Sequence, residues 1–221
     1  FNYAIAPPNK DNFKPLLPWM EYQLEKYHVN VHLNTEINAD QISEMNPDVV
    51  ICATGLKPAK LPINGFEKAV NAKEVLGGAK TGKDVVIIGG GSVGIETAEL
   101  IAQEGDKNIT IIEMTDTIAL NMVNCTRTVV LGHLKADGVH FEMNSMCKEI
   151  KEDVVVYTDK EGVEHDIHAD TVIVSVGDVP NTALFEEVKD KVNEVYNIGD
   201  SNGGGLVYKA MQDGYRVGLK I

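Results

Sequence analysis

A run of glycines between two strand-like segments constrains this 221-residue chain more than any other feature. The apolar run Val85–Ile88 precedes the glycines, and a helical pattern follows from about Ser92 to Glu104. Residues 109–112 then have the character of a second strand. This order predicts two parallel strands joined by a crossover helix. We therefore expect an α/β fold with a Rossmann-like parallel sheet.

The glycines have the spacing Gly-x-Gly-x-x-Gly, which indicates a dinucleotide site when it follows a strand and opens a helix. Gly89 allows the tight turn, Gly91 lets the backbone approach a pyrophosphate, and Gly94 lets the helix pack close to the strand. Unpaired N–H groups and a partial positive charge at the helix start favour phosphate oxygens. The sequence thus predicts a binding turn made of Gly89, Gly90, Gly91, Ser92, Val93 and Gly94.

Glu113 lies 19 residues after Gly94, at the end of the second predicted strand. An acid at this place accepts hydrogen bonds from the adenosine ribose and repels the 2′-phosphate of NADPH. No Arg occurs between the two residues, and Met114-Thr115-Asp116 adds no positive charge. We therefore predict a preference for NADH; the competing interpretation is a glycine turn in an unrelated α/β domain with an exposed Glu.

The next candidate, Glu96, is expected in the first turn of the same helix, where a carboxylate complements the helix dipole. Two interpretations stay open for it: an acid that only stabilises the helix, or a group near the nicotinamide. We predict no catalytic residue in this chain, because hydride transfer between two cofactors depends on positioning more than on acid–base groups.

The histidines and cysteines predict no metal ligand. His165 and His168 are three residues apart on an expected strand, where such residues face opposite ways. The three cysteines contain no CxxC pair, which argues against a dithiol centre and a zinc site. Their odd number fits a reducing cytoplasm. Cys52 lies in an apolar run and is expected to be buried.

Net charge and apolar runs argue against two classes of binding partner, nucleic acids and membranes. The net charge of −13 argues against nucleic acid, whose phosphates such a surface repels. No apolar run approaches the ~18 residues needed to span a bilayer, so no membrane partner is expected. The chain starts at Phe1 without an initiator Met or a signal pattern, which indicates a fragment of a longer protein.

The remaining segments complete the expected organisation. We expect helices over residues 16–27 and 126–136 and a final helix after the glycines at 203–205. Residues 56–82, rich in Pro, Gly and Lys, are expected to cross between two structural units. The other expected strands cover residues 29–33, 48–53, 141–150, 154–158, 167–176 and 195–198, with a hairpin turn at 159–162.

With these motifs in place, the chain resembles the C-terminal dinucleotide-binding region of the 2,4-dienoyl-CoA reductase, trimethylamine dehydrogenase and NADH:flavin oxidoreductase family. It is similar, more loosely, to the pyridine-nucleotide disulfide reductases. The resemblance spans nearly the whole chain. The matching residues are Ala53-Thr54-Gly55, Gly89 to Glu96, Val176-Gly177 with Pro180-Asn181, and Ile198-Gly199-Asp200.

The resemblance implies an FAD/NAD(P)-binding fold with a β-meander, in which an NAD domain is inserted into a flavin-type domain. It implies an NAD(H)-binding domain at residues 79–180 and a partial FAD- or ADP-binding domain at residues 1–78 and 181–221. By the same resemblance, Asp200 contacts the flavin ribityl chain, the helix after Gly205 points at the flavin pyrophosphate, and Glu96 lies near the nicotinamide. Thr54 and Gly55 match a turn near the flavin. Besides the glycine turn, Glu96 and Glu113, the expected cofactor-binding residues are Thr54, Gly55, Gly177, Gly199 and Asp200.

The family's first glycine fingerprint, which holds the FAD pyrophosphate, is expected before residue 1. We therefore expect this fragment to bind FAD poorly or to have lost it, and to be inactive alone. FMN and a 4Fe–4S cluster are expected only in an upstream domain that reduces an activated C=C bond of enoate or 2,4-dienoyl-CoA type. The alternatives are an NADH oxidase, a ferredoxin-type reductase and a non-catalytic dinucleotide-binding module. The sequence does not identify the substrate.

Overall fold

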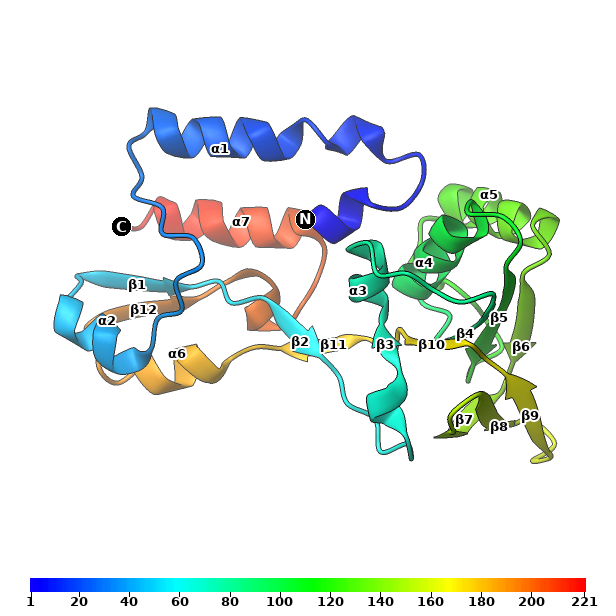
Figure 1. The fold of residues 1–221 in the computed structure, drawn as a ribbon. Helices are drawn as coiled ribbons and strands as arrows, with labels where there is room; N and C mark the ends of the chain where they lie inside the picture. Colours follow the sequence, from blue (N-terminus) through cyan, green and yellow to red (C-terminus); the bar gives the residue numbers. More distant parts are fainter. The chain divides into compact units, whose positions relative to one another are not determined.

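The computed structural model describes all residues, 1–221, and the chain divides into two compact units. Unit 1 comprises Phe1–Val29 and Lys60–Val176, and unit 2 comprises Asn30–Ala59 and Gly177–Ile221. Each unit combines helices with strands (Figure 1), which confirms the predicted α/β class. None of the helices is both long enough and apolar enough to cross a bilayer.

Unit 1 is built on five parallel strands in the order β3-β10-β4-β5-β6. Short 3-10 helices lie at Asn2–Ile5, Asp11–Phe13 and Phe66–Lys68. The sheet strands are β3 (Val70–Asn71), β4 (Asp84–Ile88), β5 (Asn108–Glu113), β6 (His140–Met143) and β10 (Thr171–Val174). The helices of this unit are α1 (Leu16–Lys26), α3 (Ala72–Leu76), α4 (Ser92–Ala102) and α5 (Asn124–Ala136).

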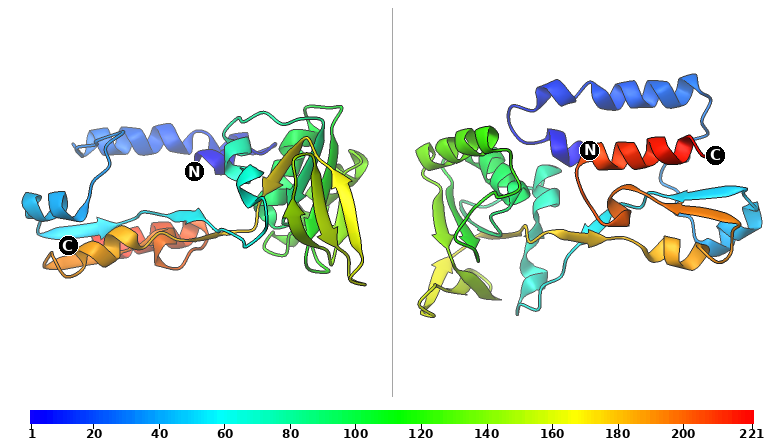
Figure 2. Two further views of the ribbon diagram at one scale, coloured as in Figure 1. Left: turned by 60° about the horizontal axis from the view of Figure 1, so that its bottom comes forward. Right: turned by 180° about the vertical axis from the view of Figure 1, so that it is seen from behind.

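Both faces of the parallel sheet are buried, and alternate residues of β4 serve different faces. Val85 and Ile87 pack with α4 and α5 through Ile95, Ala98 and Leu134. The opposite face packs on a three-stranded antiparallel meander, seen in Figure 2, made of β7 (Met146–Ile150), β8 (Val154–Thr158) and β9 (Glu164–His168). A strand buried on two faces requires a continuous apolar run, which explains why β4 was easy to predict.

Unit 2 contains two short strand pairs. Strand β1 (Val49–Cys52) pairs in parallel with β12 (Glu194–Asn197), and β2 (Leu56–Pro58) pairs antiparallel with β11 (Asp178–Pro180). Its small core joins Cys52 with Ala39, Ile42 and Val188. The remaining elements are α2 (Ala39–Met45), α6 (Ala183–Val188), a 3-10 helix (Gly199–Asn202) and α7 (Val207–Gly218).

The predicted strand at residues 29–33 is wrong, because these residues form no strand. His28 and Asn34, which flank it, have φ angles of 54° and 53°, so the chain turns at both ends. Val29, Val31 and Leu33 are 50%, 53% and 78% exposed. The apolar–polar alternation therefore has no core to face.

Two predicted long strands each divide into two. Residues 141–150 contribute to β6 in the parallel sheet and to β7 in the meander, because Asn144 (φ 52°) turns the chain and Ser145 N donates to Glu113 O. Residues 167–176 divide in the same way between β9 and β10. In contrast, the predicted turn at 159–162 does join the antiparallel strands β8 and β9.

The boundary between the units differs from the expected domain limits. Residues 60–78 belong to unit 1 because β3 pairs with β10 and α3 packs in the same core. Residues 1–29 also belong to unit 1, and residues 177–180 belong to unit 2 through β11. The segment expected only to cross between units therefore carries β2, β3 and α3.

Candidate dinucleotide-binding site

The glycine turn joins the carboxyl end of β4 to the start of α4 and is packed tightly at Gly89, Gly90 and Gly94. A Cβ at Gly90 would lie 2.5 Å from Ile118 Cγ1, the side chain of a neighbouring loop residue. Gly89 has φ +105°, and a Cβ at this residue would lie 2.4 Å from Ser175 O. A Cβ at Gly94 would lie 2.2 Å from Gly89 O, inside contact distance. Gly89 and Gly94 are thus needed for the turn itself.

Gly91 differs from both. Its φ of −67° is open to any residue, and a Cβ at this position would meet no atom within 4 Å. Neither backbone conformation nor packing explains a glycine here. The missing side chain leaves open space beside the first residues of α4, where a phosphate could approach the backbone.

The start of α4 carries no acidic residue, and the side chain of Asn121 covers part of it. Ser92 N donates to Asn121 Oδ1 at 3.0 Å, and Asn121 Nδ2 donates to Ser92 Oγ at 3.0 Å. Val93, the next residue, is 38% exposed. Sequence reasoning missed Asn121 because it lies 29 residues from Ser92.

Glu113 lies at the end of β5, next to the glycine turn. Strands β4 and β5 pair in parallel with Ile88 opposite Ile112. Glu113 Oε2 accepts from Gly90 N at 2.7 Å, and Oε1 accepts from Thr115 N at 2.9 Å and Thr115 Oγ1 at 2.8 Å. Three donors thus fix a half-buried carboxylate against the turn, as the predicted strand–turn–helix–strand geometry requires.

The expected place of Glu96 in the first turn of α4 is wrong. The helix begins at Ser92, so Glu96 is its fifth residue and lies beyond the first turn. Its carboxylate forms an ion pair with Lys10 Nζ at 2.5 Å, and the two side chains are 19% and 26% exposed. A charge partner therefore holds Glu96, and a dipole effect is not needed to explain its place. No pattern in the sequence pointed to Lys10, which lies 86 residues from Glu96.

In unit 2, the other expected cofactor-binding residues follow the two parallel strands. Thr54 and Gly55 come after β1. Thr54 Oγ1 donates a hydrogen bond to Asn181 O at 2.5 Å, and Gly55 O accepts one from Asn181 N at 2.9 Å. Gly199 and Asp200 come after β12, whose partner is β1. These residues therefore share the carboxyl edge of one strand pair, the edge at which ligands bind in parallel sheets.

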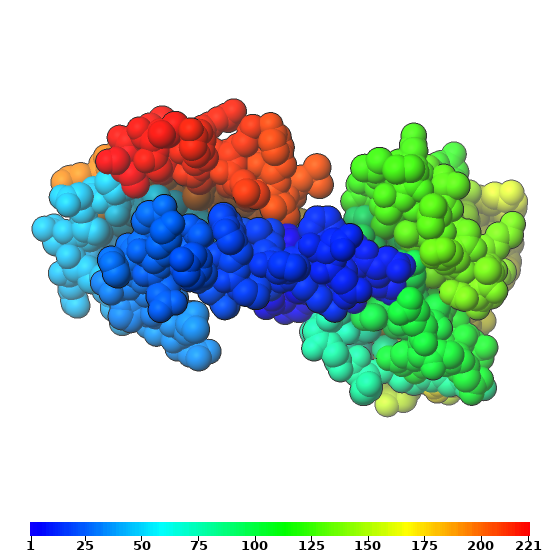
Figure 3. All heavy atoms as spheres, turned by 90° about the horizontal axis from the view of Figure 1, so that it is seen from above, coloured from blue at the N-terminus to red at the C-terminus, as the bar shows by residue number.

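Gly177 and the start of α7 complete this set. Gly177 has φ +91°, and its carbonyl accepts from Ala59 N at 3.3 Å. Helix α7 follows three glycines of positive φ, residues 203–205, and no side chain caps its first amides. The helix is coloured red in Figure 3. The exposed apolar side chains of the helix and of its two flanking residues include Leu206, Tyr208, Met211, Tyr215 and Leu219.

The cysteines form no bridge. Cys52 and Cys147 are buried and Cys125 is exposed, and all three are free. At 2% exposure, Cys52 is the buried apolar residue that the sequence predicted. Burial raises the pKa of Cys52, and it raises the pKa of Cys147 to about 11. His165 pairs with Asp159 at 2.7 Å, separately from His168.

The chain was compared with known proteins. It is 33% identical to an NADH oxidase of Thermoanaerobacter brockii over 99% of this chain and 35% of that protein. It is 32% identical to a cinnamate reductase of Clostridium sporogenes over 98% of this chain and 33% of that protein. The chain thus spans about a third of the length of these relatives.

Among solved structures, a complex of 2-naphthoyl-CoA reductase with 2-naphthoyl-CoA superposes on the whole chain with a TM-score of 0.92 and 31% identity, over 34% of that protein. Histamine dehydrogenase from Rhizobium sp. 4-9 shares the fold, with a TM-score of 0.83 and 16% identity. The family model described as pyridine nucleotide-disulphide oxidoreductase matches residues 21–214. The resemblance predicted from the sequence is thereby confirmed, and the chain belongs to the pyridine nucleotide-disulphide oxidoreductase family.

Proposed function

We propose that unit 1 binds NADH, with the pyrophosphate on residues 89–94 and the adenosine ribose on Glu113. The observation that carries the proposal is the hydrogen bond from Gly90 N to Glu113 Oε2, which fixes an acid beside the glycine turn. The open space at Gly91 supports it, since no contact within the protein requires a glycine there. The Ser92 amide would exchange the Asn121 oxygen for a phosphate oxygen.

The proposed preference for NADH over NADPH rests on charge. A 2′-phosphate near Glu113 would meet a carboxylate whose position is fixed by Gly90 and Thr115. Lys107 is the one basic residue between Gly94 and Glu113, and it lies before β5, at the opposite end of that strand. Its Nζ already donates to Thr81 O and Gly82 O, so it does not offset the acid.

We propose that unit 2 contributes part of a flavin-type site, for FAD or ADP. The uncapped amides of α7 would face a pyrophosphate, and Asp200 would accept hydrogen bonds from ribityl hydroxyls. Thr54, Gly55, Gly177 and Gly199 would shape the turns beside it. When both cofactors are bound, NADH would supply a hydride and the flavin would accept it. Glu96, held by Lys10, would orient the nicotinamide.

The same proposal covers the longer protein to which such a chain would belong. An upstream domain with FMN and a 4Fe–4S cluster would receive the electrons and reduce an activated C=C bond in the cytoplasm. The relatives named cinnamate reductase and 2-naphthoyl-CoA reductase support a conjugated substrate. The exposed apolar side chains along α7 support a covering domain, because large exposed apolar patches mark interaction sites.

A second candidate is an NADH oxidase, which the relative of that name at 33% identity favours. Both candidates need the same NADH site, and they differ in the electron acceptor. Oxygen consumption that accounts for all NADH oxidised, with one O₂ per NADH when peroxide forms or one O₂ per two NADH when water forms, and no reduction of cinnamate, would select the oxidase.

The NADH site is tested by titrating the protein with NADH and NADPH. NADH should bind more tightly, and Glu113→Ala should weaken NADH binding about fivefold to 150-fold, the equivalent of ~1–3 kcal/mol for a lost charged partner. NADPH should lose less, because the repulsion disappears together with the acid. Glu164→Ala on β9, where the acid pairs with surface Lys148, is the control and should change neither affinity. Equal affinities in the wild type would remove the role given to Glu113.

A further inference from the structure

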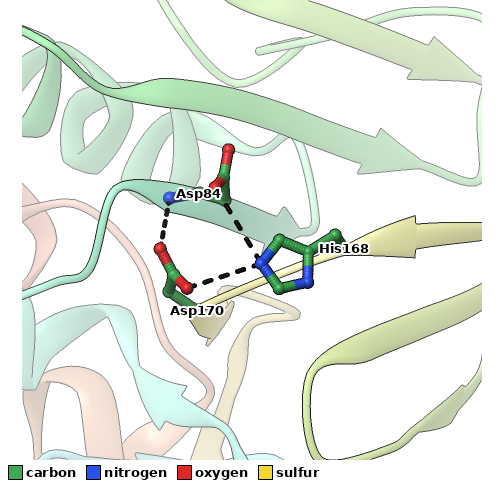
Figure 4. Close-up of side chains that lie close together, drawn as sticks. All are labelled: Asp84, His168 and Asp170. Carbon is green, nitrogen blue, oxygen red and sulfur yellow. Dashed lines mark hydrogen bonds and ion pairs between the residues drawn. The ribbon is translucent and has the colours of Figure 1, made fainter.

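Three side chains that offer metal ligands converge at the edge of the unit 1 sheet opposite the glycine turn (Figure 4). Asp84 is the first residue of β4, His168 is the last residue of β9, and Asp170 precedes β10. One ligand atom from each lies within 4.8 Å of the other two. The parallel pairing of Thr171 with Val85 brings together residues that are 84 to 86 positions apart.

His168 stands at an unusual distance from its carboxylates. Its Nε2 is 3.5 Å from Asp170 Oδ1 and 4.0 Å from Asp84 Oδ2. In the three other histidine–carboxylate pairs, the distance from the ring nitrogen to the carboxylate oxygen is 2.7–3.0 Å. These pairs are His165–Asp159, His140–Glu142 and His133–Glu99. Two ligands of an ion with bonds of ~2.1 Å lie roughly 3–4 Å apart, so the longer spacing is that of groups facing a shared cation.

Backbone amides and one side-chain amide also orient the two carboxylates of the cluster. Asp170 Oδ2 accepts from the backbone N of Lys83 and of Asp84, both at 2.9 Å. Asp84 Oδ1 accepts from Asn108 Nδ2 at 2.7 Å. In Asp84 and in Asp170, one carboxylate oxygen therefore accepts hydrogen bonds that fix the plane of the carboxylate, and the other oxygen faces His168. Outer hydrogen bonds of this kind hold metal ligands in place.

We propose that Asp84, His168 and Asp170 bind a divalent transition-metal ion, Zn²⁺, with water in the remaining positions. One imidazole nitrogen and two carboxylate oxygens form a set that zinc accepts. The His168 side chain is 56% exposed, so an ion has free access. The net charge of −13 attracts cations.

Bound at this place, the ion links the last strand of the meander to the first residue of β4 and to the residue that precedes β10. Its role is therefore structural, and it is independent of the NADH site at the other end of β4. Sequence reasoning missed the site because it compared His165 with His168. One partner of His168, Asp84, lies on a strand far away in the sequence. The other, Asp170, lies in the short connection that follows His168.

The test is calorimetric titration of the EDTA-treated protein with ZnCl₂. The wild type should bind one Zn²⁺ per chain, and His168→Ala should weaken binding at least about tenfold. His140→Ala is the matched control, since His140 is exposed and contacts a single carboxylate, and it should bind Zn²⁺ as the wild type does. His168→Ala is preferred to an Asp170 variant because Asp170 holds two backbone amides that the fold needs.

The unfolding midpoint gives a second measurement. Excess Zn²⁺ should raise the midpoint of the wild type and of His140→Ala, and not that of His168→Ala. NADH affinity should be the same with and without Zn²⁺ in all three proteins, so this site and the proposed NADH site can fail separately. Absence of zinc binding to the wild type, or equal binding by His168→Ala, would overturn the proposal.

Discussion

The glycines of the turn after β4 lack side chains for different physical reasons. Gly89 needs its positive φ, and Gly94 needs room beside Gly89 O. Gly91 needs neither, which leaves the approach of a ligand as the reason for a glycine there. The φ angle of Gly89 and the close contact at Gly94 fit the folding roles that the sequence pattern assigns to these two residues, and the role of Gly91 in binding stays a prediction.

This difference predicts opposite results for two similar variants. Gly91→Ala should fold like the wild type and weaken NADH binding about tenfold to 150-fold, since a methyl group would displace a phosphate from charged hydrogen bonds worth ~1.5–3 kcal/mol. Gly94→Ala should lower the free energy of unfolding by roughly 1–3 kcal/mol through overpacking. Urea denaturation and NADH titration would measure both.

Gly132→Ala is the control for these variants, because Gly132 lies inside α5 and a Cβ there meets no atom within 4 Å. It should leave NADH binding unchanged and raise stability by up to ~1 kcal/mol through helix propensity. Normal NADH binding by Gly91→Ala would contradict the assignment of the turn.

Cys147 predicts a loss of stability at alkaline pH. Burial raises its pKa to about 11 from an ordinary value of 9.0. Between these two pH values the unfolded chain has lost the thiol proton and the folded chain keeps it. The free energy of unfolding therefore falls as pH rises, by up to ~1.4 kcal/mol per pH unit. Cys147→Ala should therefore lose less stability than the wild type between about pH 9 and about pH 11.

Urea denaturation at several pH values would check this difference, with Cys125→Ala as the control because Cys125 is exposed. The same pH slope in the wild type and in Cys147→Ala would show that the buried thiol has no part in the effect.

At the scale of elements, the helices and strands that the sequence predicted well are those with a core on a definite side. Strand β4 is buried on both faces, and its apolar run could not be mistaken. Residues 29–33 alternate just as a half-buried strand does, yet no core faces them. The apolar pattern of a segment shows which side chains it could bury. Whether these side chains are buried depends on the tertiary structure.

Helix α2 shows a signal that was present in the sequence and was not used. Asn38 Oδ1 accepts from Asp40 N and Gln41 N, and Gln41 Oε1 accepts from Asn38 N, which together form a capping box. The sequence Asn38-x-x-Gln41 could have predicted the helix start. The short length of α2, seven residues, weakens the apolar periodicity on which the prediction depended.

Because a short helix depends on its cap, Asn38→Ala should lower the free energy of unfolding by ~0.5–2 kcal/mol. Asn38→Asp should keep most of the stability, since a carboxylate oxygen can accept the same amides. Thermal or urea unfolding of the three proteins would measure the effect. An unchanged midpoint in Asn38→Ala would mean that the packing of Ala39 and Ile42 alone holds α2.

At the scale of the whole molecule, the sequence predicted the fold class and the glycine turn between β4 and α4, and the two compact units have other limits than the expected domains. Each unit is assembled from two separate stretches of chain. Residues 70–71 join the parallel sheet of unit 1 through only two residues of β3, which is too short a run to stand out. The cluster of Asp84, His168 and Asp170 could not be predicted for a related reason. Strand pairing, and not a short spacing in the sequence, brings its members together.

The central claim is that one diphosphate and one ribose are held between the start of α4 and the end of β5. A crystal structure of the protein with NADH bound tests it most directly. We predict phosphate oxygens at the amides of Gly91 and Ser92, ribose hydroxyls donating to Glu113, and the Asn121 side chain displaced from Ser92. A dinucleotide bound away from this turn, or one whose ribose makes no hydrogen bond to Glu113, would contradict the account.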